Sequence, residues 1–198
     1  MKLIITGACG HIGSYVAENI FKIKKIKKTI LVDNLKSNRF CSIFNQKKKN
    51  GLEFHLGDLN NEKSLENFKK IDYLIHLASM TNAEKSFGKE KEMYKNNINC
   101  LKTVIKFCKK NKVKLIHLSS TSVYGKQAAL VDETCEKKYL KPQSPYAKIK
   151  LIEERMLKKE KNLQYVTFRF GTISGISQGI RFHTAVNKFC LNAAINED

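Results

Sequence analysis

Tyr146 and Lys150 stand four residues apart in a segment whose apolar spacing predicts a helix over residues 144–159. One helical turn separates them, so both side chains project from the same face. A tyrosine with a pKa near ~10 is a poor base at neutral pH. A nearby ammonium group favours the phenolate and lowers that pKa, so the pair could carry out acid–base chemistry on a hydroxyl group. In so lysine-rich a chain, the same spacing also arises by chance.

A run of four hydroxylated residues, 119–122, ends an apolar segment upstream of this tyrosine. Ser120 in this run could hydrogen-bond the same hydroxyl group as it becomes a carbonyl. Ser120, Tyr146 and Lys150 together therefore form a candidate proton-transfer site.

Three glycines, Gly7, Gly10 and Gly13, follow an apolar segment at residues 2–6 and open a stretch with helical spacing. The first permits a tight turn, the second lets the backbone approach a pyrophosphate, and the third allows close packing of helix on strand. Phosphate would then bind the free amides at the helix N-terminus. The pattern predicts a dinucleotide site, with a purely structural glycine turn as the alternative.

Asp33 stands twenty residues beyond Gly13, at the end of a second apolar segment. A carboxylate there can accept both ribose hydroxyls of adenosine and repels a 2′-phosphate, which predicts NAD rather than NADP. An ordinary cap at the end of a strand is the alternative.

The elements that must position these residues alternate between strand and helix along the chain. Strands are expected at residues 2–6, 29–32, 52–56, 72–77, 113–118 and 164–170, and helices at 12–20, 64–68, 90–110 and 144–159. This alternation predicts an α/β fold of the Rossmann type: a doubly wound parallel sheet with helices on both faces. It stops after Gly175.

Charge raises the question of a nucleic-acid partner, because 37 Lys and Arg against 18 Asp and Glu give this 198-residue chain a formal charge of +19. Of the 37, however, 33 are lysines scattered along the chain, whereas readers of bases and phosphates usually rely on arginine. We therefore expect a solvated lysine-rich surface and no specific nucleic-acid partner. Specific binding would instead show a steep dependence on salt.

Compartment and metal content are predicted from what the sequence lacks. No apolar run approaches the roughly 20 residues of a membrane span, and the early glycine motif replaces the apolar stretch of a signal peptide. The six cysteines contain no C-x-x-C pair, so neither a zinc site nor a disulfide framework is expected. We predict a cytoplasmic protein with reduced thiols and no membrane contact. No metal is expected, because His11 and His183 have no ligand-like companions.

Short motifs recur in order along nearly the whole chain, at residues 6–13, 33–35, 57–59, 76–79, 96–99, 119–125, 145–150 and 169–171. In this order and spacing the sequence resembles the extended short-chain dehydrogenase/reductase family, the NAD-dependent sugar-nucleotide epimerases and dehydratases. The resemblance implies Tyr146 as the base, Lys150 as the group that tunes it and binds ribose, and Ser120 as the orienting hydroxyl. It implies contacts to NAD from Gly7, Gly10, His11, Ile12, Gly13, Asp33, Asn34, Asp58, Leu59, Leu77, Ala78, Ser79, Asn99, Tyr146, Lys150 and Phe170.

Within those contacts the resemblance assigns particular tasks. Asp58 would bind the adenine amino group and Leu59 would flank the ring. Residues 77–79 would line the middle of the cofactor, and Asn99 would help to position the active-site helix and its water.

The same resemblance implies a nucleotide-sugar substrate, transiently oxidised at a sugar carbon. Family 4,6-dehydratases carry an Asp–Glu pair after the serine position, where this chain has Thr121 and Ser122. We therefore favour 4-epimerase-like chemistry. The alternative is a truncated, non-catalytic NAD-binding relative, because family members normally continue for roughly another hundred residues.

Two domains are expected: an NAD-binding Rossmann domain over residues 1–175, and at 176–198 the start of an incomplete substrate-binding lobe. Resemblance also implies a homodimer through the helices at 90–110 and 144–159. The apolar residues considered for that contact are Met93, Ile105, Leu151 and Met156, whose spacing fits an intramolecular core equally well.

Overall fold

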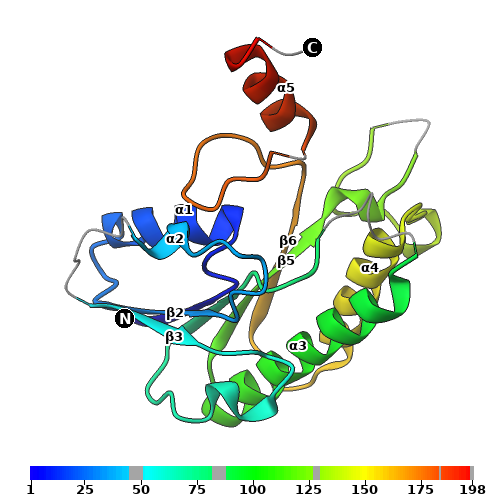
Figure 1. Cartoon of the computed structure of the whole chain (residues 1–198). Coiled ribbons are helices and arrows are strands. Elements are labelled where there is room, and N and C mark those ends of the chain that lie inside the picture. Colours follow the sequence, from blue (N-terminus) through cyan, green and yellow to red (C-terminus); the bar gives the residue numbers. More distant parts are fainter. Residues whose placement is uncertain (45–50, 82–87, 127–129, 183, 197–198) are drawn as a thin grey trace.

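Six short strands pair in parallel to form one sheet in the computed structural model, which describes residues 1–44, 51–81, 88–126, 130–182 and 184–196. The strand order is β3-β2-β1-β4-β5-β6 (Figure 1). The strands are β1 (Lys2–Thr6), β2 (Lys28–Asp33), β3 (Leu52–Leu56), β4 (Tyr73–His76), β5 (Lys114–Ser120) and β6 (Tyr165–Phe170). This order is that of the predicted Rossmann-type doubly wound sheet, which is confirmed.

Strand β1 lies at the centre of the sheet, between β2 and β4. Ile4 and Ile5 are fully buried, as expected for a parallel strand that is covered on both faces. Thr6, its last residue, pairs with Val32 of β2 and with His76 of β4. The direction of winding reverses between β1 and β4, and in such sheets ligands bind beyond the carboxyl ends of the strands at this point.

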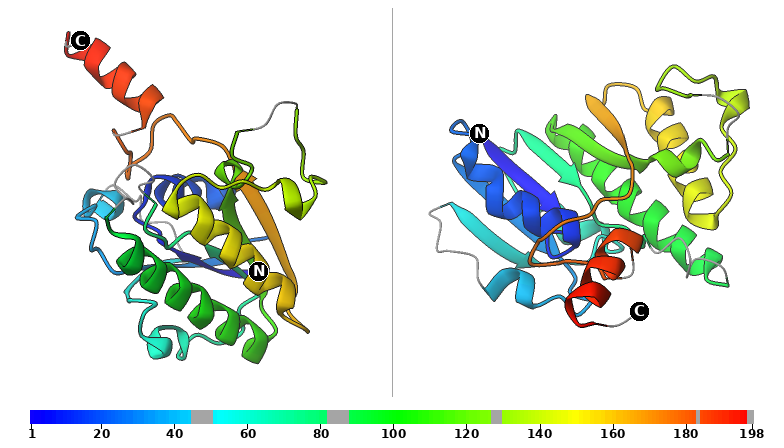
Figure 2. Two further views of the ribbon diagram at one scale, coloured as in Figure 1. Left: turned by 90° about the vertical axis from the view of Figure 1, so that its right-hand side faces the viewer. Right: turned by 90° about the horizontal axis from the view of Figure 1, so that it is seen from above.

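Helices cover both faces of the sheet, α1 on one face and α3 and α4 on the other (Figures 1 and 2). Their bounds are His11–Asn19, Glu90–Asn111 and Pro145–Lys159. Alternation along β1 places Leu3 and Ile5 in one apolar cluster with Ala17 of α1. It places Ile4 in the opposite cluster with Leu101 of α3. The sheet is thus held between two apolar layers. The candidate site residues lie at the carboxyl ends of its strands.

The apolar residues considered for a dimer contact lie instead within the chain's own core. Met93 is 2% exposed and Ile105 is 6% exposed. Met93 packs with Ile149 of α4, and Met156 joins the same cluster. These residues pack within the chain, and the homodimer stays a prediction.

Some short helices differ from the sequence prediction. The helix expected at 64–68 is a 3₁₀-helix over Glu62–Leu65, because the Asn61 side chain caps it by accepting a hydrogen bond from Lys63 N and the turn closes there. A single turn, α2 (Cys41–Phe44), has no counterpart in the prediction. Among the described residues, none of the helices combines the length and the apolar character that crossing a bilayer demands.

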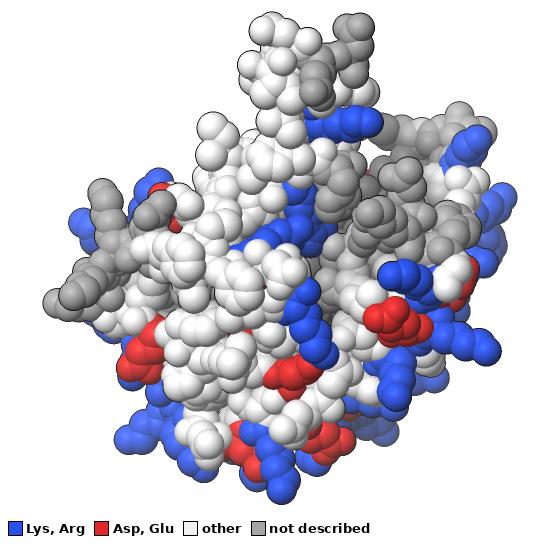
Figure 3. Space-filling view, in the orientation of Figure 1, with Lys and Arg blue, Asp and Glu red and all other residues white. Residues whose placement is uncertain are grey.

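Basic side chains on the face seen in Figure 3 are spread out, with acidic side chains among them. Lys28 pairs with Glu53 and Lys106 with Glu62, each at 2.5 Å, and the side chains of both pairs are partly or largely exposed. Exposed pairs of this kind contribute at most about 1 kcal/mol to stability. The distribution on this face is that of a solvated surface and differs from a single basic patch.

After β6 the chain returns across the start of α1 through residues 175–181, here called the return segment. His11 Nε2 lies 3.0 Å from Gly175 O, and Gly179 N donates to Ser14 Oγ at 2.9 Å. The return segment therefore packs directly on the glycine loop. Helix α5, which the sequence did not predict, follows and stands away from the sheet (Figures 1 and 2). It spans Ala185–Ala194.

Replacing Gly179 by alanine tests this packing. A Cβ there would lie 2.3 Å from Cys9 O, so Gly179→Ala should lower the free energy of unfolding by about 1–3 kcal/mol. Urea denaturation measures the change. Gly171→Ala is the matched control, since its Cβ would approach nothing closer than Thr121 Oγ1 at 4.0 Å. Equal stability of the two variants would contradict the packing.

Candidate active site

The glycine loop after β1 is shaped by two contacts that leave no room for side chains. Gly7 has φ +67°, and a Cβ on it would lie 2.6 Å from Ala78 N. A Cβ on Gly13 would lie 2.2 Å from Gly7 O and 2.8 Å from Ala8 Cα. Gly7 therefore makes the tight turn and Gly13 the close approach of helix to strand, as predicted. The resulting bare backbone at the start of α1 is a suitable cradle for a pyrophosphate.

Asp33, at the end of β2, joins this loop to the next one. Its two carboxylate oxygens accept hydrogen bonds from Cys9 N at 3.0 Å and Leu35 N at 2.8 Å. The carboxylate therefore caps the backbone at the end of the strand, which was the alternative role considered for it. Each oxygen still has a lone pair that can accept a hydrogen bond from a ribose hydroxyl. Cys9 itself is fully buried, and burial, with the charge of Asp33, raises the pKa of its thiol to about 12.

Two adjoining cavities open at this edge of the sheet, of about 690 Å³ and about 500 Å³. The larger one holds predicted contacts to the adenosine end and middle of NAD: Asp33, Asn34, Asp58, Leu59 and Ala78. The smaller one holds His11, Ile12, Gly13, Ser120, Tyr146, Lys150 and Phe170. Gly7, Gly10, Leu77 and Ser79 line both. Every predicted site residue except Asn99 therefore lines one cavity or the other.

Asp58 is ionised at the adenosine end. Burial alone would raise the pKa of this carboxyl, but hydrogen bonds from Lys36 and Asn60 outweigh it and lower the pKa to about 2. Lys36 Nζ lies 2.7 Å from Asp58 Oδ2, and its side chain is 71% exposed. A carboxylate with this charge can accept a hydrogen bond from an amino group. Lys36 is a contact of the cavity that the sequence prediction missed.

Asn97, two residues before the predicted Asn99, anchors the helix. Its side chain is buried, and it exchanges two hydrogen bonds with Met80, accepting from N at 2.8 Å and donating to O at 3.0 Å. It thereby ties α3 to the segment after β4. Asn99 is not among the described residues that line either cavity. The signal was available in the sequence, because Asn97 shares the helical face of Met93 and Leu101.

The turn after β4 is predicted to line the middle of the cofactor. Hydrogen bonds to the Thr6 side chain hold it in place. Thr6 Oγ1 lies 2.9 Å from His76 Nδ1, and it accepts hydrogen bonds from Leu77 N and Ala78 N. Burial lowers the pKa of His76 to about 3, so the ring is neutral. Since Thr6 Oγ1 already accepts two hydrogen bonds, its hydroxyl donates to Nδ1, and the turn is held without a buried charge.

Helix α4 delivers the predicted tyrosine and lysine. The Ser144 side chain caps its start by accepting from Ala147 N at 3.1 Å, which sets Tyr146 in the first turn. Lys150 lies one turn later, with Nζ 5.9 Å from the centre of the Tyr146 ring. Across the cavity, Ser120 Oγ accepts hydrogen bonds from the N–H and the hydroxyl of Ser122. Its own proton is left for a ligand.

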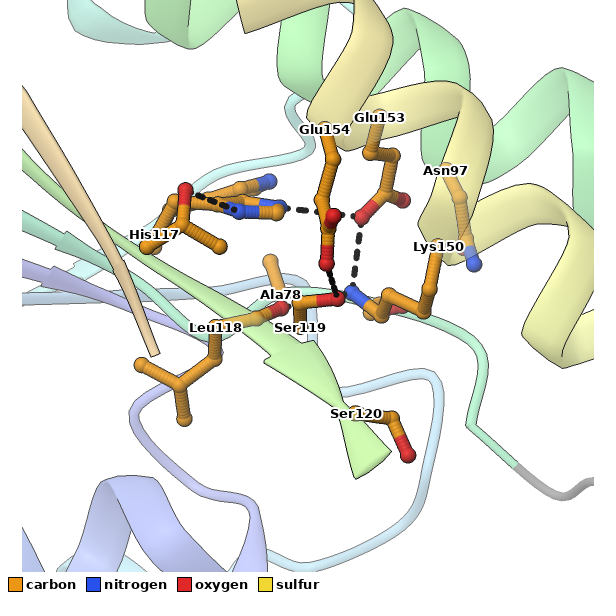
Figure 4. A network of polar contacts seen from close by, with 12 residues as sticks. Ala78, Asn97, His117, Leu118, Ser119, Ser120, Lys150, Glu153 and Glu154 are labelled. Carbon is orange, nitrogen blue, oxygen red and sulfur yellow. Dashed lines mark hydrogen bonds and ion pairs between the residues drawn. The ribbon is translucent and has the colours of Figure 1, made fainter. Parts of the chain in front are cut away.

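Lys150 is buried and lines the smaller cavity. Figure 4 shows its polar contacts. Its Nζ donates to Leu118 O at 3.0 Å and to Glu153 Oε2 at 2.8 Å. Burial would lower the pKa of this ammonium group, but the charges of Glu153 and Tyr146 outweigh it and raise the pKa. The lysine is therefore charged throughout the neutral range.

A second carboxylate on α4, that of Glu154, binds residues of the sheet. Arg169 of β6 donates to both of its oxygens, at 2.9 and 2.7 Å, and Ser119 Oγ donates to the first of them. The Arg169 guanidinium also lies 4.9 Å from the centre of the Tyr124 ring. This bidentate pair ties α4 to the edge strand beside the site.

Arg181, at the end of the return segment, lines both cavities. Asn187 Nδ2 donates to its carbonyl at 2.8 Å and fixes the backbone. Its Nε is buried and without a hydrogen-bond partner among the described residues. Burial, with the charge of Arg39 nearby, lowers the pKa of its guanidinium. A buried cation of this kind needs an anion, so the glycine cradle and Arg181 together fit the pyrophosphate of a dinucleotide. His183 lies outside the described residues.

Comparisons with known proteins agree with this geometry. The chain is 31% identical over 199 residues to a dTDP-D-glucose 4,6-dehydratase of Dictyostelium discoideum, a match that covers 89% of this chain and 45% of that protein. The solved UDP-N-acetylglucosamine 4-epimerase of Methanobrevibacter ruminantium, in complex with UDP-N-acetylmuramic acid, is 28% identical with a TM-score of 0.84. The UDP-glucuronic acid 4-epimerase of Bacillus cereus, in complex with UDP-glucuronic acid and NAD, is 27% identical with a TM-score of 0.85. Each of these two structures matches 100% of this chain, which covers 64% of theirs.

The chain thus spans 45% of the length of the dehydratase and 64% of the length of each epimerase. A family model matches residues 3–196. It includes the glycine loop, Asp33, and the Ser120, Tyr146 and Lys150 positions. The chain belongs to the NAD dependent epimerase/dehydratase family, whose cofactor is NAD.

Proposed function

We propose that this chain binds NAD together with a nucleotide sugar and supports transient oxidation at a sugar carbon, with 4-epimerase-like chemistry. The observation that carries the proposal is the smaller cavity, in which Ser120, Tyr146 and Lys150 lie with the glycine loop. When bound, NAD would accept a hydride from the sugar carbon and later return it. The residues of the chain supply the proton transfer.

Tyr146 is the proposed base. As a phenolate, favoured by the Lys150 ammonium group, it takes the proton from the sugar hydroxyl and later returns it. Ser120 donates its hydroxyl proton to the same sugar oxygen and orients it. Two of the three N–H groups of the Lys150 ammonium donate to Leu118 O and Glu153 Oε2. The third can donate to a ribose hydroxyl of the cofactor.

Thr121 and Ser122 favour an epimerase over a dehydratase. Elimination of water needs an acid and a base beside the leaving hydroxyl, and both residues line the cavity where those groups would act. Thr121 Oγ1 instead donates to Phe170 O, and Ser122 Oγ donates to Ser120. Neither side chain ionises in the neutral range.

A binding-only role, in which the chain holds NAD without turnover, is the second candidate. Among the described residues after β6, those that line the smaller cavity are at 171–173, 181, 184 and 185. We propose residues 176–198 as the start of a substrate-binding lobe, and Phe189 there is 67% exposed. Little enclosure of a sugar comes from this part of the chain.

A panel of UDP-, GDP- and dTDP-sugars with NAD separates the two roles. Epimerase-like chemistry gives a change of NAD absorbance or a new stereoisomer with one of the sugars. Tight binding of NAD with no turnover across the panel would favour the binding-only role. We propose a cytoplasmic location, a homodimer and no specific nucleic-acid partner.

Cofactor selectivity tests Asp33. We expect NADH to bind at least about tenfold more tightly than NADPH, because the carboxylate repels a 2′-phosphate. Asp33→Asn should narrow this difference, and fluorescence of the reduced nicotinamide measures both affinities. Asp132→Asn, at an exposed residue, is the control. Equal or tighter binding of NADPH by the unaltered protein would refute the assignment.

Tyr146→Phe tests the base. The variant should bind NAD as before and lose about 10²- to 10⁴-fold in turnover, the usual contribution of a positioned acid–base group. Steady-state kinetics with the sugar identified in the panel measure the loss. Turnover that survives nearly intact would mean that another group moves the proton.

Arg181→Gln tests the anion site. Loss of a charge-assisted bond should weaken NAD binding about 10- to 100-fold. The unfolding midpoint of the free protein should not fall, since the guanidinium Nε has no hydrogen-bond partner among the described residues. Calorimetric titration and thermal melts measure the two effects. Arg155→Gln, on the exposed side of α4, is the control. An unchanged affinity for NAD would exclude Arg181 from the site.

A further inference from the structure

A buried carboxylate–imidazole pair, which the proposed mechanism does not use, contacts Lys150 between β5 and α4. Glu153 on α4 is 1% exposed and His117 on β5 is 0% exposed. His117 Nε2 lies 3.0 Å from Glu153 Oε2, the same oxygen that accepts from Lys150. Figure 4 shows the three side chains converging between the strand and the helix.

The imidazole orients the carboxylate. Burial lowers the pKa of His117, with the Glu153 hydrogen bond acting in the opposite direction, so the ring is neutral. Nε2 must then donate to the carboxylate, and Nδ1 accepts from Thr167 Oγ1, 3.3 Å away on β6. Two donors thus fix one oxygen of Glu153 between the sheet and Lys150.

The ionic state of the cluster follows from the same contacts. Burial would raise the pKa of Glu153, but attraction by Lys150 and the His117 hydrogen bond outweigh it and hold the pKa below its ordinary value. Glu153 is therefore an anion and Lys150 a cation, so the pair is neutral overall. The other ionisable groups around the pair are His76 on β4, Cys100 on α3, and Tyr146 and Glu154 on α4.

These neighbours leave Glu153 as the anion that faces Lys150 most directly. His76 is neutral, and burial raises the pKa of Cys100 to about 12, so it carries no charge. The carboxylate of Glu154 is engaged by Arg169 and Ser119. The net field that Lys150 exerts on Tyr146 therefore depends on how much of its charge Glu153 cancels.

We propose that Glu153, oriented by His117, is a positioning residue that fixes the place of Lys150 and partly neutralises its charge, and so sets the pH range in which Tyr146 acts as a base. This rests on the proposed function for the role of Tyr146. The sign follows from electrostatics: a nearby anion favours the protonated forms of both Tyr146 and Lys150. Its removal makes both groups lose their protons at lower pH.

Glu153→Gln tests the proposal, because the amide keeps the size and removes the charge. The titration of Tyr146 is read as phenolate absorbance of each protein minus that of its Tyr146→Phe counterpart. We expect the midpoint in Glu153→Gln to fall by about one pH unit. Glu154→Gln is the matched control, one residue along the same helix, and should lower stability without moving this midpoint. An unmoved midpoint in Glu153→Gln would overturn the proposal.

A second variant decides the matter if Glu153→Gln does not fold. Glu153→Asp draws the carboxylate back from Nζ by one methylene group and should lower the midpoint by a smaller amount. No change in its midpoint would equally overturn the proposal. The readout needs no turnover, so its failure is separate from that of the proposed function. If the sugar panel yields a substrate, the acidic limb of kcat/KM should move to lower pH in step with the titration.

Discussion

Close backbone contact around Gly7 is the constraint on which the site depends. Three segments meet there: the end of β1, the start of α1 and the turn after β4. Side chains at Gly7 or Gly13 would overlap backbone atoms of the neighbouring segments. Because the segments touch directly, the amides that face a phosphate, the carboxylate of Asp33 and the turn at Ala78 keep fixed positions relative to one another. Binding then requires little ordering of the chain.

A different constraint acts on the side of the proposed proton transfer, where buried charged and polar groups take the place of close backbone contact. Lys150, Glu153 and His117 are buried together, and the removal of one partner from such a cluster leaves an uncompensated group at a cost of several kcal/mol. The stability of α4 on the sheet and the chemistry of its tyrosine are consequently linked through one carboxylate. Glu154 also ties α4 to the sheet, but through other partners, Arg169 and Ser119.

Much of this arrangement was predictable from local pattern. The strands, the glycine loop, Asp33 and the Tyr146–Lys150 pair are encoded in short spacings, and the structure brings nearly all of them to one edge of the sheet. Glu153 and His117 escaped prediction because their partnership is formed across two elements distant in sequence. The position of Arg181 at the site likewise depends on contacts between distant parts of the chain, because the return segment packs on α1. Asn97 was within reach of helical periodicity and was missed in favour of Asn99.

The burial of Cys9 has a consequence for how the site responds to oxidants. Thiols react as thiolates, and with its pKa raised to about 12 this thiol is almost wholly protonated at neutral pH. Its backbone is also covered, because Ser42 Oγ donates to Cys9 O at 2.7 Å. Peroxide or an alkylating agent therefore reaches this sulfur only when the loop opens. The folded glycine loop therefore protects its own cysteine from oxidation and alkylation.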